Sequence, residues 1–442
     1  MKLLIRRLKP VQVMVAGYAF AGLLSTLLLL LPIAQKPGIN LSFVDAWFTA
    51  TSAISVTGLA IANTADTFTL FGQIVILCTI QIGGIGFMTL GTFIWVILGR
   101  KVGLRNRLVI QWDQNQTALS GMVTLIKRIT ALAFVIEGTG AVILGTYLMH
   151  DYPWYQAFYL GIFHAVSAFT HAGFDLFSSS LIPFQSDLVI NGTVMLLIIL
   201  GGIGYPVLIE LMDYRKERHL SLHSKLSLTI YFSLLLIGFI VIYLVEAGHA
   251  FRDYSLGDSL LISMFTSVTS RSAGLATIDV NLFMLPTVLF ITILMFIGAS
   301  PSSCGGGIRT TTLAILILTI RSFARGEQEV RVMGRQVHPL DVNKAIVVGI
   351  TAVGLFMTGL LLMAYWEGQR FTLMQMMFEI SSAFGTCGLS LGITSQLSSF
   401  SKVILICLMF IGRIGLGALL LLIQQQDKKA TYHFPKERVI VG

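Results

Sequence analysis

The chain has 442 residues, of which 55% are hydrophobic and only 12% are charged, and its mean hydropathy is +0.82. Soluble proteins carry about 25% charged residues, so this composition excludes the roughly 150-residue soluble domains that the length would otherwise suggest. Much of the exterior must face lipid. We expect no nucleic-acid partner despite the net charge of +9, because Lys and Arg of a membrane protein gather in its cytoplasmic loops.

Eight apolar segments reach the length of about 20 residues that spans a bilayer core roughly 30 Å thick. They cover residues 11–33, 70–98, 129–149, 188–209, 226–245, 282–320 (interrupted), 345–366 and 403–424. With the N-terminus inside, 23 of the 30 Lys and Arg residues fall on the cytoplasmic side, as the positive-inside rule expects. The sequence predicts an all-α polytopic protein in contact with membrane lipid, with both termini cytoplasmic.

Four shorter stretches lie between pairs of these segments. Each has about ten residues of apolar helical pattern, a polar stretch, and then Gly followed by Leu or Phe: 45–59, 155–174, 258–275 and 371–389. In three of them Ser-Ala begins six residues before the glycine, whereas the third has Val268 at that place. Such self-similarity indicates repeats. We expect four units in pseudo-fourfold symmetry: 1–100, 101–213, 214–325 and 326–442.

The short helices cannot cross a membrane, so the backbone that follows them must be buried or line water. Glycine permits the positive φ that turns carbonyl groups inward, as in a loop that binds ions. The negative C-terminal ends of the helices favour a cation. A glycine that merely ends a helix is common, but four at matched positions favour an ion pathway.

The segments Ser-Val-Thr-Gly58-Leu, Ala-Phe-Thr-His-Ala-Gly173-Phe, Thr-Ser-Arg-Ser-Ala-Gly274 and Phe-Gly-Thr-Cys-Gly388-Leu resemble the four filters of the Trk/Ktr/HKT superfamily of K⁺ transporters. The likeness is greatest to the bacterial KtrB-type membrane subunit. It implies K⁺ uptake across the plasma membrane through eight transmembrane helices, arranged as four repeats of M1, pore helix and M2. The implied K⁺ ligands, mainly backbone carbonyls, belong to Val56, Thr57, Gly58, His171, Ala172, Gly173, Ser272, Ala273, Gly274, Thr386, Cys387 and Gly388.

The same resemblance implies a homodimer with one pore per subunit and stimulation by Na⁺. It also implies a cytosolic nucleotide-binding regulatory ring of the KtrA/KtrC type, with no nucleotide bound by this chain. A Na⁺-conducting relative is one alternative, although Gly58 argues against it because Ser there accompanies Na⁺ transport in the family. A secondary transporter with inverted repeats is another. No HExxH or GxxxxGK[ST] motif indicates an enzyme.

The sixth segment is broken by the glycine-rich stretch 298–308, whose freed backbone groups must face protein or water. The resemblance implies that this stretch is a gating loop beneath the filter. Its expected gate residues are Gly298, Ser300, Pro301, Ser302, Gly305, Gly306 and Gly307, with Arg413 as the residue that holds the loop closed. An Arg413 that only packs between helices is the alternative.

Other ionisable residues at membrane depth carry weaker expectations. Arg271 is expected to support its filter loop from behind. Glu137 and Glu379 are candidates to pair with it or with another cation, or to attract ions. His171 occupies a position where close relatives commonly have Asn. It either faces the entrance and makes conductance depend on pH, or stays neutral and hydrogen-bonds behind the filter, which we favour.

Overall fold

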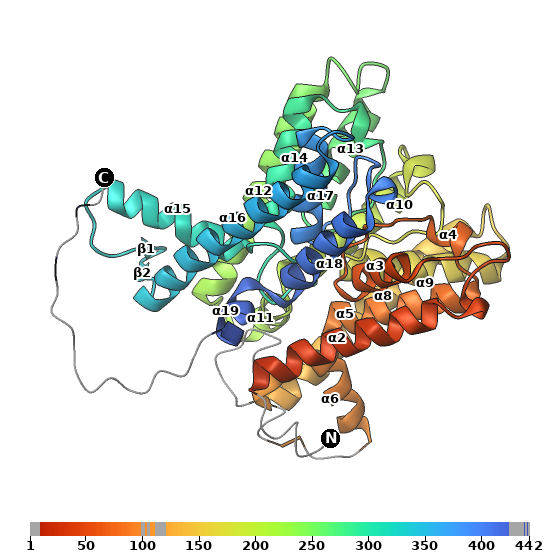
Figure 1. Cartoon of the computed structure of the whole chain (residues 1–442). Helices are drawn as coiled ribbons and strands as arrows, with labels where there is room; N and C mark the ends of the chain where they lie inside the picture. The colour runs from red at the N-terminus through yellow and green to blue at the C-terminus, as the bar shows by residue number, and fades with distance from the viewer. Residues whose placement is uncertain are drawn as a thin grey trace.

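The computed structural model describes residues 9–98, 102–103, 107–110, 121–423, 437 and 440. Helices make up nearly all of the regular structure in this part of the chain. The exception is a small antiparallel hairpin of β1 (Arg331–Val332) and β2 (Arg335–Gln336), which lies beside α15 at the edge of the helical assembly (Figure 1).

The helices follow one another in an order that repeats four times. A long helix comes first in each round: α2 (Pro10–Leu29), α8 (Met122–Leu148), α12 (Leu222–Glu246) and α16 (Pro339–Glu367). A shorter helix follows: α3 (Phe43–Ile54), α9 (Trp154–Thr170), α13 (Leu256–Thr269) and α17 (Leu373–Phe384). After a loop comes a third helix: α5 (Leu70–Ile85), α10 (Leu188–Ile203), α14 (Leu285–Ile297) and α18 (Ser399–Ile414). A fourth continues beyond a break: α6 (Phe87–Ile97), α11 (Tyr205–Glu217), α15 (Thr310–Ala324) and α19 (Leu416–Ile423).

Minor elements lie in the connections between these helices. They are α4 (Thr64–Thr67) and the 3₁₀ turns η1 (Pro32–Ala34), η2 (Ile182–Phe184), η3 (Val280–Leu282) and η4 (Thr394–Gln396). Three of the four short helices begin at a hydroxyl residue that caps the first turn. Ser42, Ser255 and Thr372 each accept a hydrogen bond from the backbone N–H three residues on, which satisfies a donor that the helix itself leaves unpaired.

Four of the described helices, α2, α8, α12 and α16, are long and apolar enough to span a membrane. Three further spans are possible if each bent pair, α5–α6, α10–α11 and α18–α19, is counted as one. The sequence predicted one uninterrupted span at each of these places, but the pairs bend by 97–98°. Each bend lies at a glycine with positive φ, namely Gly86, Gly204 and Gly415. A residue in this conformation interrupts the helical hydrogen bonds, and such an interruption kinks a helix. In the third round, residues 298–309 separate α14 from α15.

The four short helices join the rounds into a closed cycle. Helix α9 packs against α5, α13 against α10, α17 against α14, and α3 against α18, which brings the last round back to the first. A phenylalanine occupies the same place in each short helix and is almost completely buried: Phe48, Phe163, Phe265 and Phe378. Burial of a large aromatic side chain contributes about 1.5–3 kcal/mol, so these four positions anchor the short helices to their neighbours.

An ion pair closes this cycle between α3 and α18. The Lys402 ammonium donates to the Asp45 carboxylate over 2.8 Å, and the side chains are 11% and 23% exposed. Burial by itself raises the pKa of the Asp45 carboxyl, but hydrogen bonds from Lys402 and Ser42 outweigh burial and hold that pKa below its usual value. The pair therefore stabilises the fold above the unfolded-state pKa of 3.8, and this contribution disappears as the pH falls below it.

We expect Lys402→Met to lower the stability at pH 7 by about 1–2 kcal/mol, because it leaves a partly buried carboxylate without its charged partner. Thermal unfolding of the purified protein in detergent measures this change, and the difference from the wild type should shrink as the pH falls below 3.8. The exposed pair Arg128–Asp213 provides the control, since Arg128→Gln should change stability by at most about 0.5 kcal/mol. Equal losses for both variants would show that Lys402 does not close the cycle.

Candidate functional site

The loops that follow the four short helices share one backbone conformation. The four glycines, Gly58, Gly173, Gly274 and Gly388, have φ between +68° and +98°. The residue two places before each glycine also has positive φ, although none of these four is a glycine: Val56, His171, Ser272 and Thr386. Left-handed conformation at alternate positions turns successive carbonyl groups to one side of a loop. Because non-glycine residues rarely adopt it, its presence in all four loops indicates a shared constraint.

The four glycines form a ring. A Cβ added to any of them would meet the carbonyl oxygen just before the glycine of another loop, in the cyclic order Gly58 to Ala172, Gly173 to Ala273, Gly274 to Cys387, and Gly388 to Thr57. The four glycines and the four residues just before them, eight of the twelve predicted K⁺ ligands, are therefore brought together in one ring, and Val56, His171, Ser272 and Thr386 directly precede them in the chain. No cluster of three or more His, Cys, Asp or Glu suited to a metal occurs in the described part of the chain. The atoms that the four loops bring closest to one another in the ring are carbonyl oxygens and glycine Cα atoms.

Buried hydroxyl groups fix the shape of each loop. Ser52 and Ser382 accept hydrogen bonds from the backbone N–H of Gly58 and Gly388, over 3.1 and 3.0 Å. Ser167 instead donates to the carbonyl oxygen just after Gly173, over 2.6 Å. These three serines are the ones that the sequence placed six residues before each glycine.

The third loop departs from the sequence pattern because it is one residue shorter. The buried phenylalanine lies ten residues before the glycine in the other repeats but nine before Gly274. Counted from Phe265, the residue equivalent to the serines is Thr269 and not Val268. The Thr269 hydroxyl donates to the carbonyl oxygen of Leu275 over 2.6 Å, as Ser167 does in the second loop.

A second set of loop supports was not predicted. His164 and Glu379 occupy equivalent positions in α9 and α17, one residue after the buried phenylalanine. Each accepts the backbone N–H of the residue three places after the glycine, Leu176 and Leu391 respectively. Glu379 also accepts hydrogen bonds from the hydroxyls of Ser390 and Thr394. The sequence signal that could have revealed these supports is an ionisable residue directly after the buried phenylalanine.

The other ionisable residues at membrane depth form hydrogen bonds rather than ion pairs. Glu137 accepts a hydrogen bond from the Gln81 amide over 2.7 Å, and neither it nor Glu379 is bonded to Arg271. His171 is fully buried, and its Nε2 lies 2.7 Å from the carbonyl oxygen of Ile198. This geometry places the imidazole behind its loop and away from solvent, which agrees with the reading we favoured.

The stretch 298–308 is non-helical and rests on the junction of α10 and α11. Its backbone N–H groups at Ser300 and Cys304 donate to the carbonyl oxygens of Gly202 and Gly201, over 3.1 and 3.2 Å. The N–H of Tyr205 donates to Ser302 in return, over 3.0 Å. An added Cβ at Gly204 would lie 2.6 Å from the carbonyl oxygen of Pro301, so this contact requires a glycine.

Two residues of the third glycine loop hold the stretch from above. Arg271 is fully buried and donates from Nε and Nη2 to the carbonyl oxygen of Gly298, over 3.0 and 2.5 Å. The Ser272 hydroxyl accepts from the N–H of Gly306 over 3.1 Å and lies 2.7 and 2.9 Å from the carbonyl oxygens of Gly385 and Thr386. Ser272 thus joins the third and fourth loops to the stretch 298–308. Arg271 supports this stretch rather than its own loop.

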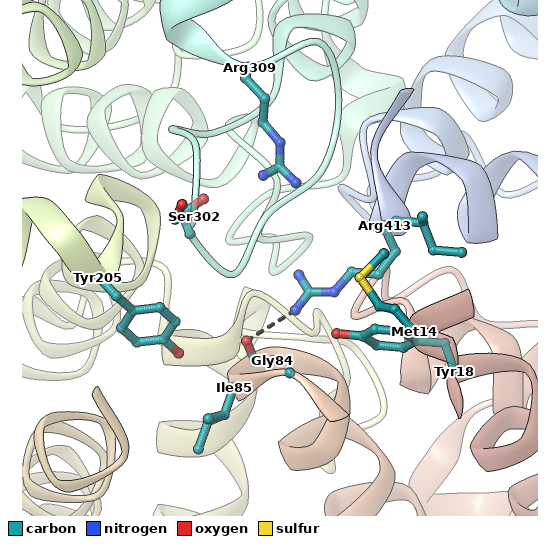
Figure 2. A pocket seen from close by; sticks show the side chains of 11 residues that line it. Met14, Tyr18, Gly84, Ile85, Tyr205, Ser302, Arg309 and Arg413 are labelled. Carbon is teal, nitrogen blue, oxygen red and sulfur yellow. Dashed lines mark hydrogen bonds between the residues drawn. The ribbon is translucent and has the colours of Figure 1, made fainter. Parts of the chain in front are cut away.

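Arg413 holds the stretch from the side of α18. Its guanidinium donates to the carbonyl oxygen of Cys304 and to those of Gly83 and Gly84 at the end of α5. Figure 2 shows this group beside the cavity under the stretch, with Arg309 pointing into the same space. The predicted gate residues Gly298 to Gly307 and Arg413 are therefore in one contact network.

The apolar helices and the ring of backbone loops define a multi-pass helical membrane protein. The family model "TrkH: Cation transport protein" matches residues 14–432. The chain belongs to this family of cation transport proteins, as the four loop motifs suggested.

Two curated proteins of Bacillus subtilis (strain 168) are similar over nearly the whole chain. The Ktr system potassium uptake protein D is 47% identical over 99% of this chain and 98% of its own length. The Ktr system potassium uptake protein B is 38% identical over 92% of both chains. The crystal structure of the potassium transporter TrkH from Vibrio parahaemolyticus matches with a TM-score of 0.72 and 19% identity, over 92% of this chain and 84% of that one. This last likeness concerns the fold.

Proposed function

We propose that the chain takes up K⁺ across a bacterial plasma membrane, as the ion-translocating subunit of a Ktr-type system. The ring of four glycine loops is the observation that carries this proposal. Two proteins that are similar to this chain over almost their full length are named potassium uptake proteins. Their names support K⁺ as the ion. The four long helices, the three bent pairs and α14 together with α15 then form eight spans with both termini in the cytoplasm, divided into units 1–100, 101–213, 214–325 and 326–442.

Selection of K⁺ follows from the backbone of the four loops. Carbonyl oxygens at the glycine and at the two residues before it replace the hydration shell of the ion. Helices α3, α9, α13 and α17 end three to five residues before the glycines, so their negative ends stabilise a cation at the ring. Glycine at all four positions favours K⁺ over Na⁺ in this family.

The stretch 298–308 acts as the gate of the pathway. It lies in contact with the third and fourth loops through Ser272 and with α5 through Arg413, so ions leaving the ring must pass it. Its hydrogen bonds to Gly201 and Gly202 hold it in place. Opening requires these bonds and those of Arg413 to break.

The transport system includes further components. The word "system" in the names of the Ktr relatives supports a partner, and we assign this role to a cytosolic nucleotide-binding ring that acts on a homodimer of this chain. The chain itself binds no nucleotide, and Na⁺ stimulates uptake.

Rescue of a K⁺-uptake-deficient bacterium at low external K⁺ tests this function. The chain should restore growth when expressed with a regulatory partner, and growth should improve when Na⁺ is added. Failure to restore growth despite normal membrane expression contradicts K⁺ uptake. Equal rescue with and without Na⁺ contradicts the stimulation by Na⁺ but not the uptake of K⁺.

Ser272→Ala is expected to raise K⁺ flux through the closed state by about 3–10-fold. The substitution leaves the buried N–H of Gly306 without its acceptor, which costs about 1–3 kcal/mol in the closed arrangement. Flux of K⁺ from proteoliposomes in the absence of a regulatory partner measures the effect. Ser263→Ala is the matched control, because that buried hydroxyl bonds only within α13. Unchanged flux in Ser272→Ala removes this residue from the gate.

A further inference from the structure

The four breaks between the third and fourth helices carry a common motif. The sequence is Gly-Gly-Ile-Gly in the first two repeats, at residues 83–86 and 201–204. In the third repeat it becomes Gly-Gly-Ile-Arg309, and in the fourth Gly-Arg413-Ile-Gly. Arginine thus replaces glycine once in each of two repeats, at different positions of the motif.

Arg309 keeps the backbone conformation of the glycine that it replaces. Its φ and ψ are +86° and +141°, against +102° and +136° for Gly204 and +88° and +141° for Gly415. This region of φ and ψ is essentially restricted to glycine, and a side chain there costs on the order of 1–3 kcal/mol. Backbone strain of this kind is found mainly at functional sites. The conformation of Arg309 therefore indicates that its guanidinium has a functional role.

The two arginines line one small cavity beneath the stretch 298–308. The cavity has a volume of about 40 Å³, and Tyr18, Tyr205, Ser302 and Ser303 also line it. In Figure 2 the Arg309 guanidinium points down into the space beside that of Arg413. A single water needs about 10–15 Å³ of such volume. The space therefore admits a monatomic ion or a few waters, and excludes a nucleotide.

The charge of these arginines is not balanced by protein groups in the described part of the chain. Arg309 donates from Nη1 to the carbonyl oxygens of Ser300 and Gly305, and Arg413 donates only to carbonyl oxygens. Neither forms an ion pair with a described carboxylate. Each guanidinium has five N–H donors, so N–H groups of both remain for a further acceptor. Two like charges that line one small cavity repel each other, and an anion between them would offset this repulsion.

Helix ends add to the positive potential of the cavity. Gly86, Tyr205 and Arg309 line it. Gly86 and Arg309 are the N-cap residues of α6 and α15, and Tyr205 is the first residue of α11. The N-terminal end of a helix carries partial positive charge and favours anions. These ends supplement the arginines.

We propose that this cavity binds one small monovalent anion, of the size of chloride, between the guanidiniums of Arg309 and Arg413. Both arginines also hold carbonyl groups of the stretch 298–308. The anion therefore binds the arrangement in which the stretch is in place and stabilises it. By linkage, raising the anion concentration favours the closed gate. The effect on flux rests on the proposed function, whereas binding of the anion does not.

Thermal unfolding of the purified protein tests binding. At constant ionic strength, replacing gluconate with chloride should raise the Tm of the wild type by about 2 °C or more in a saturable manner. Arg309→Gly should abolish this shift. This variant restores the residue of the three sister breaks and relieves backbone strain, so it is expected to fold. Arg331→Gln, which removes an exposed arginine of the hairpin, should keep the shift.

Flux measurements test the consequence for gating. In proteoliposomes with the voltage clamped by a protonophore, replacement of chloride by gluconate should raise K⁺ flux of the wild type several-fold, and leave that of Arg309→Gly unchanged. Equal Tm values in both anions, or a chloride shift retained in Arg309→Gly, overturn the anion site. A normal chloride shift with no K⁺ flux in either anion leaves the site in place and contradicts the proposed function instead.

Discussion

Gly58→Ser is expected to reduce K⁺ uptake by at least about tenfold and to weaken the preference for K⁺ over Na⁺. The glycine has φ of +88°, and an added Cβ would lie 2.5 Å from the carbonyl oxygen of Ala172 and 2.7 Å from Cα of Gly173. Left-handed backbone costs an ordinary residue about 1–2 kcal/mol, and the contact forces the second loop to move. A free-energy change of 1.4 kcal/mol corresponds to a factor of ten. Displacement of one ion-binding carbonyl is therefore sufficient to cause the expected loss of K⁺ uptake.

Gly38 offers a control for the backbone strain alone. Its φ of +87° equals that of Gly58 within a degree, yet an added Cβ there would have nothing within 4 Å. Gly38→Ser should therefore lower stability slightly and leave K⁺ uptake and selectivity close to the wild-type values. The comparison uses initial rates of K⁺ and Na⁺ uptake at matched expression. If Gly58→Ser keeps both the rate and the ion preference, the ring of glycines is not the selective site.

Arg413→Gln is expected to raise K⁺ flux through the closed state by at least about tenfold. The substitution removes the charge that holds the carbonyl groups of Cys304, Gly83 and Gly84. Each hydrogen bond to a charged group contributes about 1.5–3 kcal/mol. Loss of even one of these bonds shifts the equilibrium toward the open gate by about a factor of ten.

The matched control for this prediction keeps the charge but changes its shape. Arg413→Lys presents a compact ammonium that cannot reach carbonyl groups on both sides as a planar guanidinium does, so its flux should lie between those of Arg413→Gln and the wild type. Flux of K⁺ from proteoliposomes without a regulatory partner provides the measurement. Wild-type flux in Arg413→Gln, with an unchanged Tm, would mean that Arg413 only packs between helices.

The ring of loops was accessible to sequence reasoning because each loop needs its glycine. Positive φ and close contact with a neighbouring loop permit no side chain at Gly58, Gly173, Gly274 or Gly388, so the pattern survives in all four repeats. The stretch 298–308 was recognisable for a similar reason, since four glycines and a proline in an apolar segment break a helix. Where the backbone accepts only glycine or breaks a helix, the sequence shows a pattern that can be recognised.

The parts that were missed depend on side chains whose chemistry differs between repeats. His164 and Glu379 support their loops in the same way although one is an imidazole and the other a carboxylate. Thr269 escaped attention because the third loop is one residue shorter. The motif shared by Arg309 and Arg413 was overlooked because arginine replaced glycine at two different places. The bends at Gly86, Gly204 and Gly415 were also missed, since a glycine within an apolar segment does not by itself require a kink.

Competition between ions during uptake by the purified protein tests the central claim most directly. Proteoliposomes containing only this chain should take up K⁺ down an imposed gradient, and a tenfold excess of external Na⁺ should not inhibit the initial K⁺ rate. The same excess of Na⁺ should inhibit K⁺ uptake by Gly58→Ser, whose ring is distorted. Strong inhibition of the wild type by Na⁺, or equal uptake of both ions, contradicts K⁺ selection by the four glycine loops.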